Sequence, residues 1–235
     1  MKFVIDKSIF EKFPELLIGV LSVKNLNNKD ASPEINSLLK HQEENVRENY
    51  NLESLSSQPK IEVWREAYRT FGAKPKENRS SVENLYKMVL SGNNLRHINK
   101  LVDIYNVISL KHTLPVGGED LDKTQGDIQL TFAGANEPDV ILLGDKDSRS
   151  PHEGEVIYKD EISTICRRWN WREADRTKLT EETKNCILVI EALPPTSKNE
   201  VEQATNELKI FVEKFCGGEI NSTTLGANEL EFQLT

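Results

Sequence analysis

The sequence lacks the short motifs by which many enzyme families are recognised. Its 235 residues contain no G-x-S-x-G elbow, no H-E-x-x-H, no Walker loop and no dinucleotide-binding glycine fingerprint. The three cysteines, Cys166, Cys186 and Cys216, form no C-x-x-C pair and have no histidine pair near them. Neither a disulfide framework nor a zinc site is therefore indicated, and we expect no metal and no cofactor.

Long apolar runs are also missing. No run approaches the length of a membrane span, and the opening residues MKFVIDKSIF lack the basic-then-apolar layout of a signal peptide. Hydrophobic residues make up 37% of the chain and charged residues 29%, which is ordinary for a soluble protein. We therefore expect a cytoplasmic protein with no membrane partner.

Positive charge is in deficit. There are 30 lysines and arginines against 38 aspartates and glutamates, for a net charge of −8. Nucleic-acid binding is dominated by cationic contacts to phosphates, so this charge argues against broad adhesion to nucleic acid, and we expect no DNA partner. A contact with RNA would be confined to local basic clusters. Two such clusters are Lys74, Lys76 and Arg79, and Arg167, Arg168, Arg172 and Arg176.

Hydrophobic periodicity predicts a mixture of helices and strands in one compact unit of two packed lobes. Residues 1–60 are expected to form an N-terminal segment that packs on the unit of residues 61–235. Helix start signals stand at Ser32-Pro33, at Ser80 with Glu83, and at Ser197 with Glu200. Helices are predicted over residues 33–46, 61–71, 81–89, 95–108 and 198–215. Strands are predicted over residues 3–5, 17–23, 128–132, 140–143, 156–158, 162–166, 186–190 and 230–234, with a short helix before the second.

The stretch from Leu95 to Asp127 combines three signals. A predicted helix, with Asn106 beside its apolar face, is followed by Pro115-Val116-Gly117-Gly118 and then by an acidic turn that leads into a strand. Paired glycines let backbone amides approach a ligand closely, but they also form tight turns that bind nothing. His112, just before the glycines, is either an acid/base group or a cap at the helix end. Both interpretations are open at each position.

The run Arg167-Arg168-Trp169-Asn170-Trp171-Arg172 is the least ordinary in the chain. Two tryptophans and an amide flanked by guanidinium groups can stack on a base and grip a phosphate or carboxylate. The competing interpretation is a packing cluster at a strand end. Glu155 is similarly ambiguous, because it is either an acceptor that faces a pocket or an exposed acid at the start of a strand.

Five segments carry a family resemblance: YRTFGAKPKENRSSVENL, VDIYNVISL, LPVGGEDLDKTQGDI, EGEVIY and CRRWNWREAD. They include a VD-x-x-N helix, a proline-containing loop and a D-x-D-K-x-x-G-x-I strand entry. Their joint order, from Ile61 to Leu193, resembles the B3/B4 editing domain of the phenylalanyl-tRNA synthetase β subunit and its free-standing versions. The resemblance implies an α+β fold with mixed sheets packed against helices.

The resemblance also implies a site. In the synthetase, this domain hydrolyses the ester that joins tyrosine to the phenylalanine tRNA, and a G-E pair at the place of Gly154-Glu155 lines its pocket. We accordingly expect catalytic roles for Gly117, Gly118 and Glu155. Substrate-binding roles are expected for Asn106, His112, Trp169, Asn170, Arg172 and Ala174. RNA-binding roles are expected for Lys74, Lys76, Arg79 and Arg168.

Two departures from the family pattern concern the amino-acid pocket. The synthetase has a histidine in a P-L-H-A-F-D segment, where this chain has a glycine in Pro115-Val116-Gly117-Gly118-Glu119-Asp120. Its later T-D-A segment falls on Arg172-Glu173-Ala174, so the alanine agrees and the threonine does not. Tyrosine specificity does not carry over, and an arginine there would favour a carboxylate or phosphate.

Two functions follow as hypotheses. The first is a stand-alone aminoacyl-tRNA editing-like hydrolase that acts in trans on a mischarged tRNA and does not activate amino acids. Hydrolysis of this activated ester needs only a positioned water and stabilisation of the developing oxyanion, which fits a chain without a catalytic triad. The second is a non-catalytic module that binds tRNA or a small ligand resembling an amino acid or a nucleotide.

Overall fold

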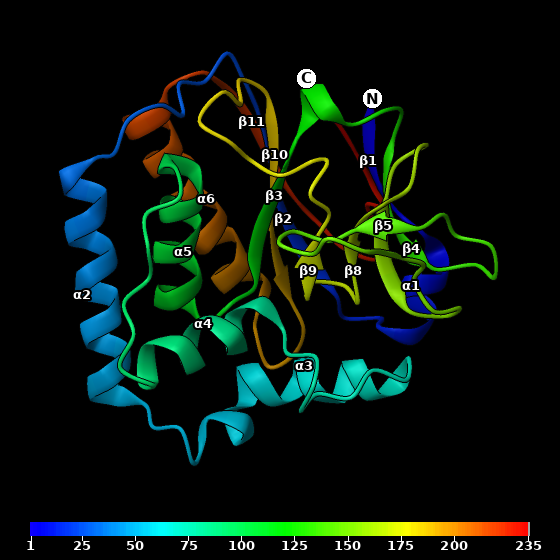
Figure 1. The fold of residues 1–235 in the computed structure, drawn as a ribbon, viewed down its shortest axis with the longest axis horizontal. Coiled ribbons are helices and arrows are strands. Elements are labelled where there is room, and N and C mark those ends of the chain that lie inside the picture. The colour runs from blue at the N-terminus through cyan, green and yellow to red at the C-terminus, as the bar shows by residue number, and fades with distance from the viewer. Residues whose placement is uncertain (235) are drawn as a thin grey trace.

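The structure, a computed structural model, describes residues 1–234 as two β-sheets packed face to face, with helices against the outer face of one sheet (Figure 1). Thr235, the last residue of the expected unit 61–235, lies outside the described residues. One sheet has the strand order β11-β2-β10-β3 and the other β12-β1-β4-β7-β8-β9. The second sheet is mixed, because β1 and β4 are parallel and its other pairs antiparallel. The fold is therefore α+β.

The four-stranded sheet consists of β2 (Leu17–Lys24), β3 (Val116–Asp120), β10 (Cys186–Ala192) and β11 (Glu219–Leu225). The six-stranded sheet consists of β1 (Lys2–Ile5), β4 (Ile128–Phe132), β7 (Val156–Lys159), β8 (Thr164–Arg167), β9 (Arg172–Glu173) and β12 (Glu231–Gln233). A separate pair joins β5 (Val140–Ile141) to β6 (Ser148–Arg149). Segments from both ends of the chain thus enter both sheets.

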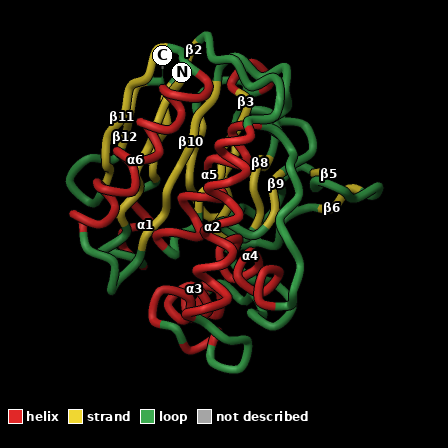
Figure 2. The backbone as a smooth tube through the Cα atoms, turned by 90° about the vertical axis from the view of Figure 1, so that its left-hand side faces the viewer, coloured by secondary structure: helices red, strands yellow, loops and turns green. Residues whose placement is uncertain are grey.

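Two helices, α5 (Lys100–His112) and α6 (Lys198–Cys216), cover the outer face of the four-stranded sheet, and α2 (Pro33–Asn49) packs against α5 outside them (Figure 1 and Figure 2). Apolar side chains of α5 and α6 pack with Leu188 and Ile190 of β10 in one buried cluster. Burial of this continuous apolar surface stabilises the layer.

A second buried cluster lies between the sheets and extends to the other helices, α1 (Lys7–Lys12), α3 (Pro59–Thr70) and α4 (Ser81–Leu90). Helix α3 runs along the base of the molecule in the view of Figure 1. Trp64 of α3 is buried with its ring centroid 5.0 Å from that of Trp169. Two short 3-10 helices, η1 (Leu55–Ser57) and η2 (Leu121–Lys123), complete the elements.

The helix start signals are confirmed. The Ser32, Ser80 and Ser197 side chains each accept a hydrogen bond from a first-turn amide of α2, α4 and α6. At α6 the Glu200 carboxylate also accepts the Ser197 amide, so the capping box is complete there.

Three predictions about local structure are wrong. Gly117 and Gly118 form no turn but lie inside β3, because β10 pairs with this segment residue by residue. The central helix begins at Lys100, not at Leu95, and Ile98 is exposed before it. Strand β11 was not predicted at all.

Within residues 1–234, no helix combines the length and apolarity needed to cross a bilayer.

Candidate functional site

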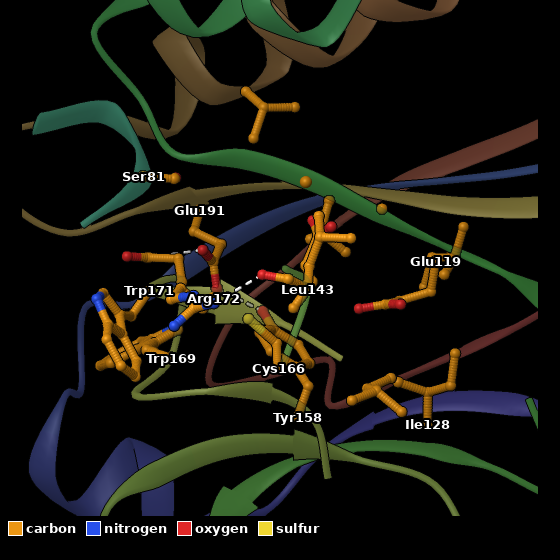
Figure 3. Close-up of a pocket in the computed structure, with 18 of the residues that line it drawn as sticks. Ser81, Glu119, Ile128, Leu143, Tyr158, Cys166, Trp169, Trp171, Arg172 and Glu191 are labelled. Atoms are coloured by element: carbon orange, nitrogen blue, oxygen red, sulfur yellow. Dashed lines mark hydrogen bonds between the residues drawn. The ribbon is translucent and has the colours of Figure 1, made fainter. Parts of the chain in front are cut away.

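A cavity of about 230 Å³ lies between the two sheets. A void of about 150 Å³ accommodates benzene, so this one is large enough for a group of amino-acid side-chain size. Figure 3 shows side chains entering it from both sheets. Its apolar walls include Phe3, Ile128, Ile165, Trp169, Ile187 and Val189. At its rim, Leu143 is 45% exposed and the Arg172 side chain 32% exposed.

Strand alternation places a carboxylate in this cavity. Successive side chains of β10 point to opposite faces of the sheet, so Leu188 and Ile190 meet the helices while Ile187, Val189 and Glu191 line the cavity. Glu191 is thus a buried carboxylate on a strand whose other cavity-facing residues, Ile187 and Val189, are apolar.

Glu191 is held by two hydrogen bonds. The Tyr158 hydroxyl donates to its Oε1 at 2.5 Å, and the Asn170 Nδ2 donates to its Oε2 at 2.7 Å. The Asn170 Oδ1 in turn accepts from the Tyr68 hydroxyl at 2.9 Å. Burial raises the pKa of Glu191 to about 7, although both hydrogen bonds favour the charged form. The carboxylate therefore titrates near neutral pH in a fixed orientation.

Two further carboxylates, Glu119 of β3 and Glu173 of β9, line the cavity. Burial raises the pKa of Glu173 to about 7, against an opposing contribution from the Gly118 amide. Burial also raises the pKa of Glu119 well above its usual range, and the nearby charge of Glu173 raises it further. Glu119 is only 7% exposed, and its Oε2 accepts no hydrogen bond from any of residues 1–234.

Arg172 contributes positive charge to the rim, but that charge is already paired. Its Nη2 and Nη1 donate to the Asp145 carboxylate at 2.8 and 3.1 Å. Its guanidinium also lies 5.5 Å from the ring centroid of Trp171. The ion pair fixes the arginine at the entrance and leaves the interior of the cavity with a surplus of acidic groups.

Comparison with known proteins assigns the family. The sequence model described as the B3/4 domain matches residues 63–217. The chain belongs to the B3/4 domain family. Over 119 residues, 51% of this chain, it is also 29% identical to the phenylalanine–tRNA ligase beta subunit of Fusobacterium nucleatum subsp. nucleatum. The matched segment is only 14% of that relative, so the chain spans a small part of its length.

Several predicted site residues of the B3/4 domain meet at the cavity: Gly117, Gly118, Trp169, Asn170 and Arg172. Arg168 and Trp169 have positive φ angles of 48° and 66°, and this bend turns Asn170 toward Glu191. The Ser81 amide of α4 donates to the Asn170 carbonyl at 2.9 Å and fixes the bend. Trp169 is fully buried between Phe13 and Trp64, so its ring is a wall of the cavity.

The two glycine amides of the B3/4 domain face in different directions. Strand β3 lies at the edge of its sheet, so its amides alternate between β10 and the open side. The Asp120 amide donates to the Thr177 carbonyl at 2.9 Å, away from β10. The Gly118 amide has the same direction and lies near Glu173, whereas the Gly117 amide points into the ladder. Their role in stabilising an oxyanion stays a prediction.

Four of the predicted catalytic and substrate-binding residues do not line the cavity. The Arg167 guanidinium donates to both oxygens of Glu155 at 2.7 and 3.0 Å, so this acid forms a buried ion pair. His112 pairs with Glu207 at 2.7 Å on the helical side. Ala174 packs with Val140 and Leu142. Asn106 is buried on α5. Their predicted roles in binding or catalysis stay predictions.

The predicted RNA-binding residues lie beside the rim. Arg168 donates to Asn78 in the loop that carries Lys74 and Lys76, and its guanidinium lies 4.5 Å from the ring centroid of Trp171. Lys76 is exposed. Arg79 belongs to the same loop and lies 3.7 Å from Glu83. The contact of Arg168 with Asn78 therefore places this loop near Trp171, which lines the cavity. Arg168 also pairs with Glu155 at 3.3 Å, and Lys74 pairs with Glu77 at 3.6 Å.

Sequence reasoning missed three acids and one hydroxyl of the cavity: Glu119, Glu173, Glu191 and Tyr158. Glu191 did leave a signal, because a charged residue directly follows the apolar run Cys186–Ile190. A charge that continues a buried strand needs a partner or a function. Glu119 was assigned to an acidic turn, which the strand pairing of β3 overturns.

Proposed function

We propose that the cavity receives the aminoacyl end of a mischarged aminoacyl-tRNA, and that the domain hydrolyses its ester in trans without activating amino acids. The observation that carries this proposal is a mostly apolar cavity, open at one rim, whose buried Glu191 titrates near neutral pH. The B3/4 family and the similarity to a phenylalanine–tRNA ligase beta subunit support it.

Glu191 is the general base in this mechanism. A base works best when its pKa lies near the working pH, and its burial brings Glu191 to about 7. Tyr158 and Asn170 hold the carboxylate so that it orients a water molecule toward the ester carbonyl. The water adds to the carbonyl carbon, its proton passes to Glu191, and the bond to the ribose oxygen then breaks with return of the proton to that oxygen.

The RNA end of the substrate stays outside the cavity. Only an amino-acid side chain fits a void of about 230 Å³, so the ester lies at the rim near Trp171 and Arg172. Arg168 lies beside this rim and contacts the loop that carries Lys74 and Lys76, and these three basic side chains provide phosphate contacts to the RNA end.

Deacylation of a panel of mischarged tRNAs by the purified protein tests the proposal. We expect turnover of at least one pair, a rate that rises with pH through about 7, and a loss of about 10²- to 10⁴-fold in Glu191→Gln. Arg172→Ala should lower the turnover rate less than Glu191→Gln does, because it changes the rim of the cavity and not the base.

The matched control is Glu202→Gln, the same chemical change on the exposed side of α6, which should keep full activity. Circular dichroism and thermal unfolding establish that each variant is folded. The hydrolase proposal would be contradicted if the folded wild type deacylated no tRNA of the panel, or if Glu191→Gln kept full activity.

One observation favours a second candidate, a non-catalytic binding module. The Gly117 amide is directed into the sheet and the Gly118 amide toward a carboxylate, so neither is free to stabilise an oxyanion. A module of this kind would bind a small amino-acid-like ligand without turnover. Saturable binding of an aminoacyl amide, together with silence in the deacylation panel, would favour it.

A further inference from the structure

The cavity contains an acidic group with a free acceptor. Glu119 is 7% exposed, and its Oε2 accepts no hydrogen bond within residues 1–234. The Thr177 hydroxyl lies close enough to lower the pKa of this carboxyl, but it likewise forms no hydrogen bond of normal geometry. An unpaired buried carboxylate is costly, because it loses its water without gaining a partner. A free acceptor that lines a cavity is a binding group for whatever fills that cavity.

A second carboxylate shares this position. Glu173 Oε1 lies 3.3 Å from the point where a Cβ on Gly117 would stand. Gly117 and Glu119 are two residues apart on β3, so they face the same side at a spacing of about 7 Å. The absent side chain at Gly117 makes room for the carboxylate of Glu173 beside Glu119.

The cations around this carboxylate pair are already engaged. Arg172 pairs with Asp145 at 2.8 Å, and Arg176 pairs with Asp160 at 2.8 Å. Lys178 pairs with Asp175 at 2.7 Å. Arg176 lowers the pKa of Glu119 by its charge, but within residues 1–234 no lysine or arginine forms an ion pair with Glu119 or Glu173. A cationic ligand would therefore supply the partner that the two carboxylates lack when they ionise.

The geometry also says which end of a ligand reaches the pair. In Figure 3, Glu119 and Ile128 lie at the opposite end of the cavity from Trp169 and Trp171. The exposed rim is at Leu143 and Arg172, where an attached RNA would remain. The group that contacts Glu119 is thus the distal end of the side chain, not the α-amino group next to the ester.

We propose that Glu119 and Glu173 together bind a primary ammonium group at the end of an aliphatic side chain, so that this site selects a basic, lysine-like aminoacyl group. The inference rests on the proposed use of the cavity as an aminoacyl site. Apolar walls such as Ile128 and Ile187 contact the methylene groups, and the two carboxylates accept the ammonium protons.

Ligand binding should release protons. Burial raises the pKa of both acids, and the charge of Glu173 raises the pKa of Glu119 further, so the empty pair retains protons that an ammonium group displaces. Affinity for the ammonium ligand should therefore rise with pH as the pair ionises. The other titratable or charged groups around Glu119 are Arg176, Asp160, Tyr105, Tyr158 and Cys166, and the last three have raised pKa values.

The experiment compares lysinamide with norleucinamide by calorimetry. Both carry the same α-ammonium group and a linear side chain, and only lysinamide has a terminal ammonium. We expect the wild type to prefer lysinamide by about 10- to 100-fold, as hydrogen bonds to charged groups allow. Glu119→Gln and Glu173→Gln should each reduce this preference at least tenfold, while Glu202→Gln should keep it. Titration in buffers of different ionisation enthalpy measures the released protons.

Three outcomes would overturn the inference: equal binding of the two amides by the wild type, a preference that survives in both cavity variants, or no lysinamide binding by the folded protein at millimolar concentration. A preference for lysinamide without any deacylation would support the inference and contradict the hydrolase proposal. Deacylation confined to aminoacyl groups with uncharged side chains would support the hydrolase proposal and contradict the inference.

Discussion

The two faces of the four-stranded sheet are built from the same strands but serve different ends. Toward α5 and α6, β10 presents Leu188 and Ile190 to a closed apolar layer. Toward the second sheet it presents Val189 and Glu191 to a cavity with buried acids. The first face stabilises the fold, whereas the second lowers its stability, because burial removes carboxylates from water. Alternation along one strand therefore separates the structural core from the candidate site.

The largest effect is expected on the helical face. Leu188→Ala removes a fully buried side chain from the apolar layer and should lower the free energy of unfolding by about 2–5 kcal/mol. Val189→Ala, one residue along on the partly exposed cavity face, should cost about 1 kcal/mol. Urea unfolding of both variants measures the difference. Equal losses would mean that the two faces do not differ in packing.

The adjacent glycines of β3 sharpen the same contrast. A Cβ on Gly118 would stand 2.5 Å from Leu188 Cδ2 and 2.6 Å from the Ile187 carbonyl oxygen. Because a backbone atom cannot move aside, Gly118→Ala should cost about 1–3 kcal/mol of stability. A Cβ on Gly117 would meet only Glu173 Oε1, at 3.3 Å. Gly117→Ala should leave stability nearly unchanged but shift Glu173 and weaken lysinamide binding.

Calorimetric unfolding together with the amide titration checks this pair of variants. If Gly117→Ala proves the less stable protein, then the assignment of the two glycines to opposite faces is wrong.

The sequence showed much of this fold, for local reasons. Start signals such as Ser197 with Glu200 act within one helical turn, so they are visible without knowledge of the tertiary structure. Strand β3 was invisible, because Gly117 and Gly118 favour a turn by themselves and only pairing with β10 extends them. Strand β11 has a polar sequence and likewise exists through its pairing with β2.

The candidate site was predictable only in part. Trp169, Asn170 and Arg172 were found because their composition is unusual for a short run. The three cavity acids were missed because they are three among 38 acidic residues, and burial, which raises their pKa, depends on the packing of two sheets. Glu155 shows the converse, since the acid that the resemblance favoured is engaged by Arg167.

The cavity acids should make the stability contributed by the cavity face depend on pH. The pKa of Glu119, Glu173 and Glu191 is raised in the folded protein, so the folded state holds protons that the unfolded state has released. The stability that these three acids contribute should be fully present below their ordinary value of 4.5 and should be lost as pH rises through about 7. Glu119→Gln should reduce this fall and make the protein about 1–3 kcal/mol more stable at pH 8.

Urea unfolding at pH 5 and pH 8 measures this effect. The two proteins should differ less at pH 5, where more of the cavity acids are protonated. A Glu119→Gln variant that loses stability at pH 8 would show that the carboxylate has a stabilising partner and would argue against a free acceptor.

The smallest effect, with the opposite sign, is expected on the helical side at Glu200. Hydrogen bonds from Ser197 and Lys60, together with the charge of Lys60, lower the pKa of Glu200 to about 2. Its contribution to stability is therefore present above about pH 4.5 and is lost as pH falls through about 2. Because this side chain is 40% exposed and screened by solvent, Glu200→Gln should cost less than about 1 kcal/mol at pH 8. Urea unfolding at pH 8 compares the two variants. If Glu200→Gln loses stability and Glu119→Gln gains it, the same chemical change has opposite effects on the helical side and in the cavity. Changes of the same sign would mean that net charge governs both variants, since each removes one negative charge from a chain at −8.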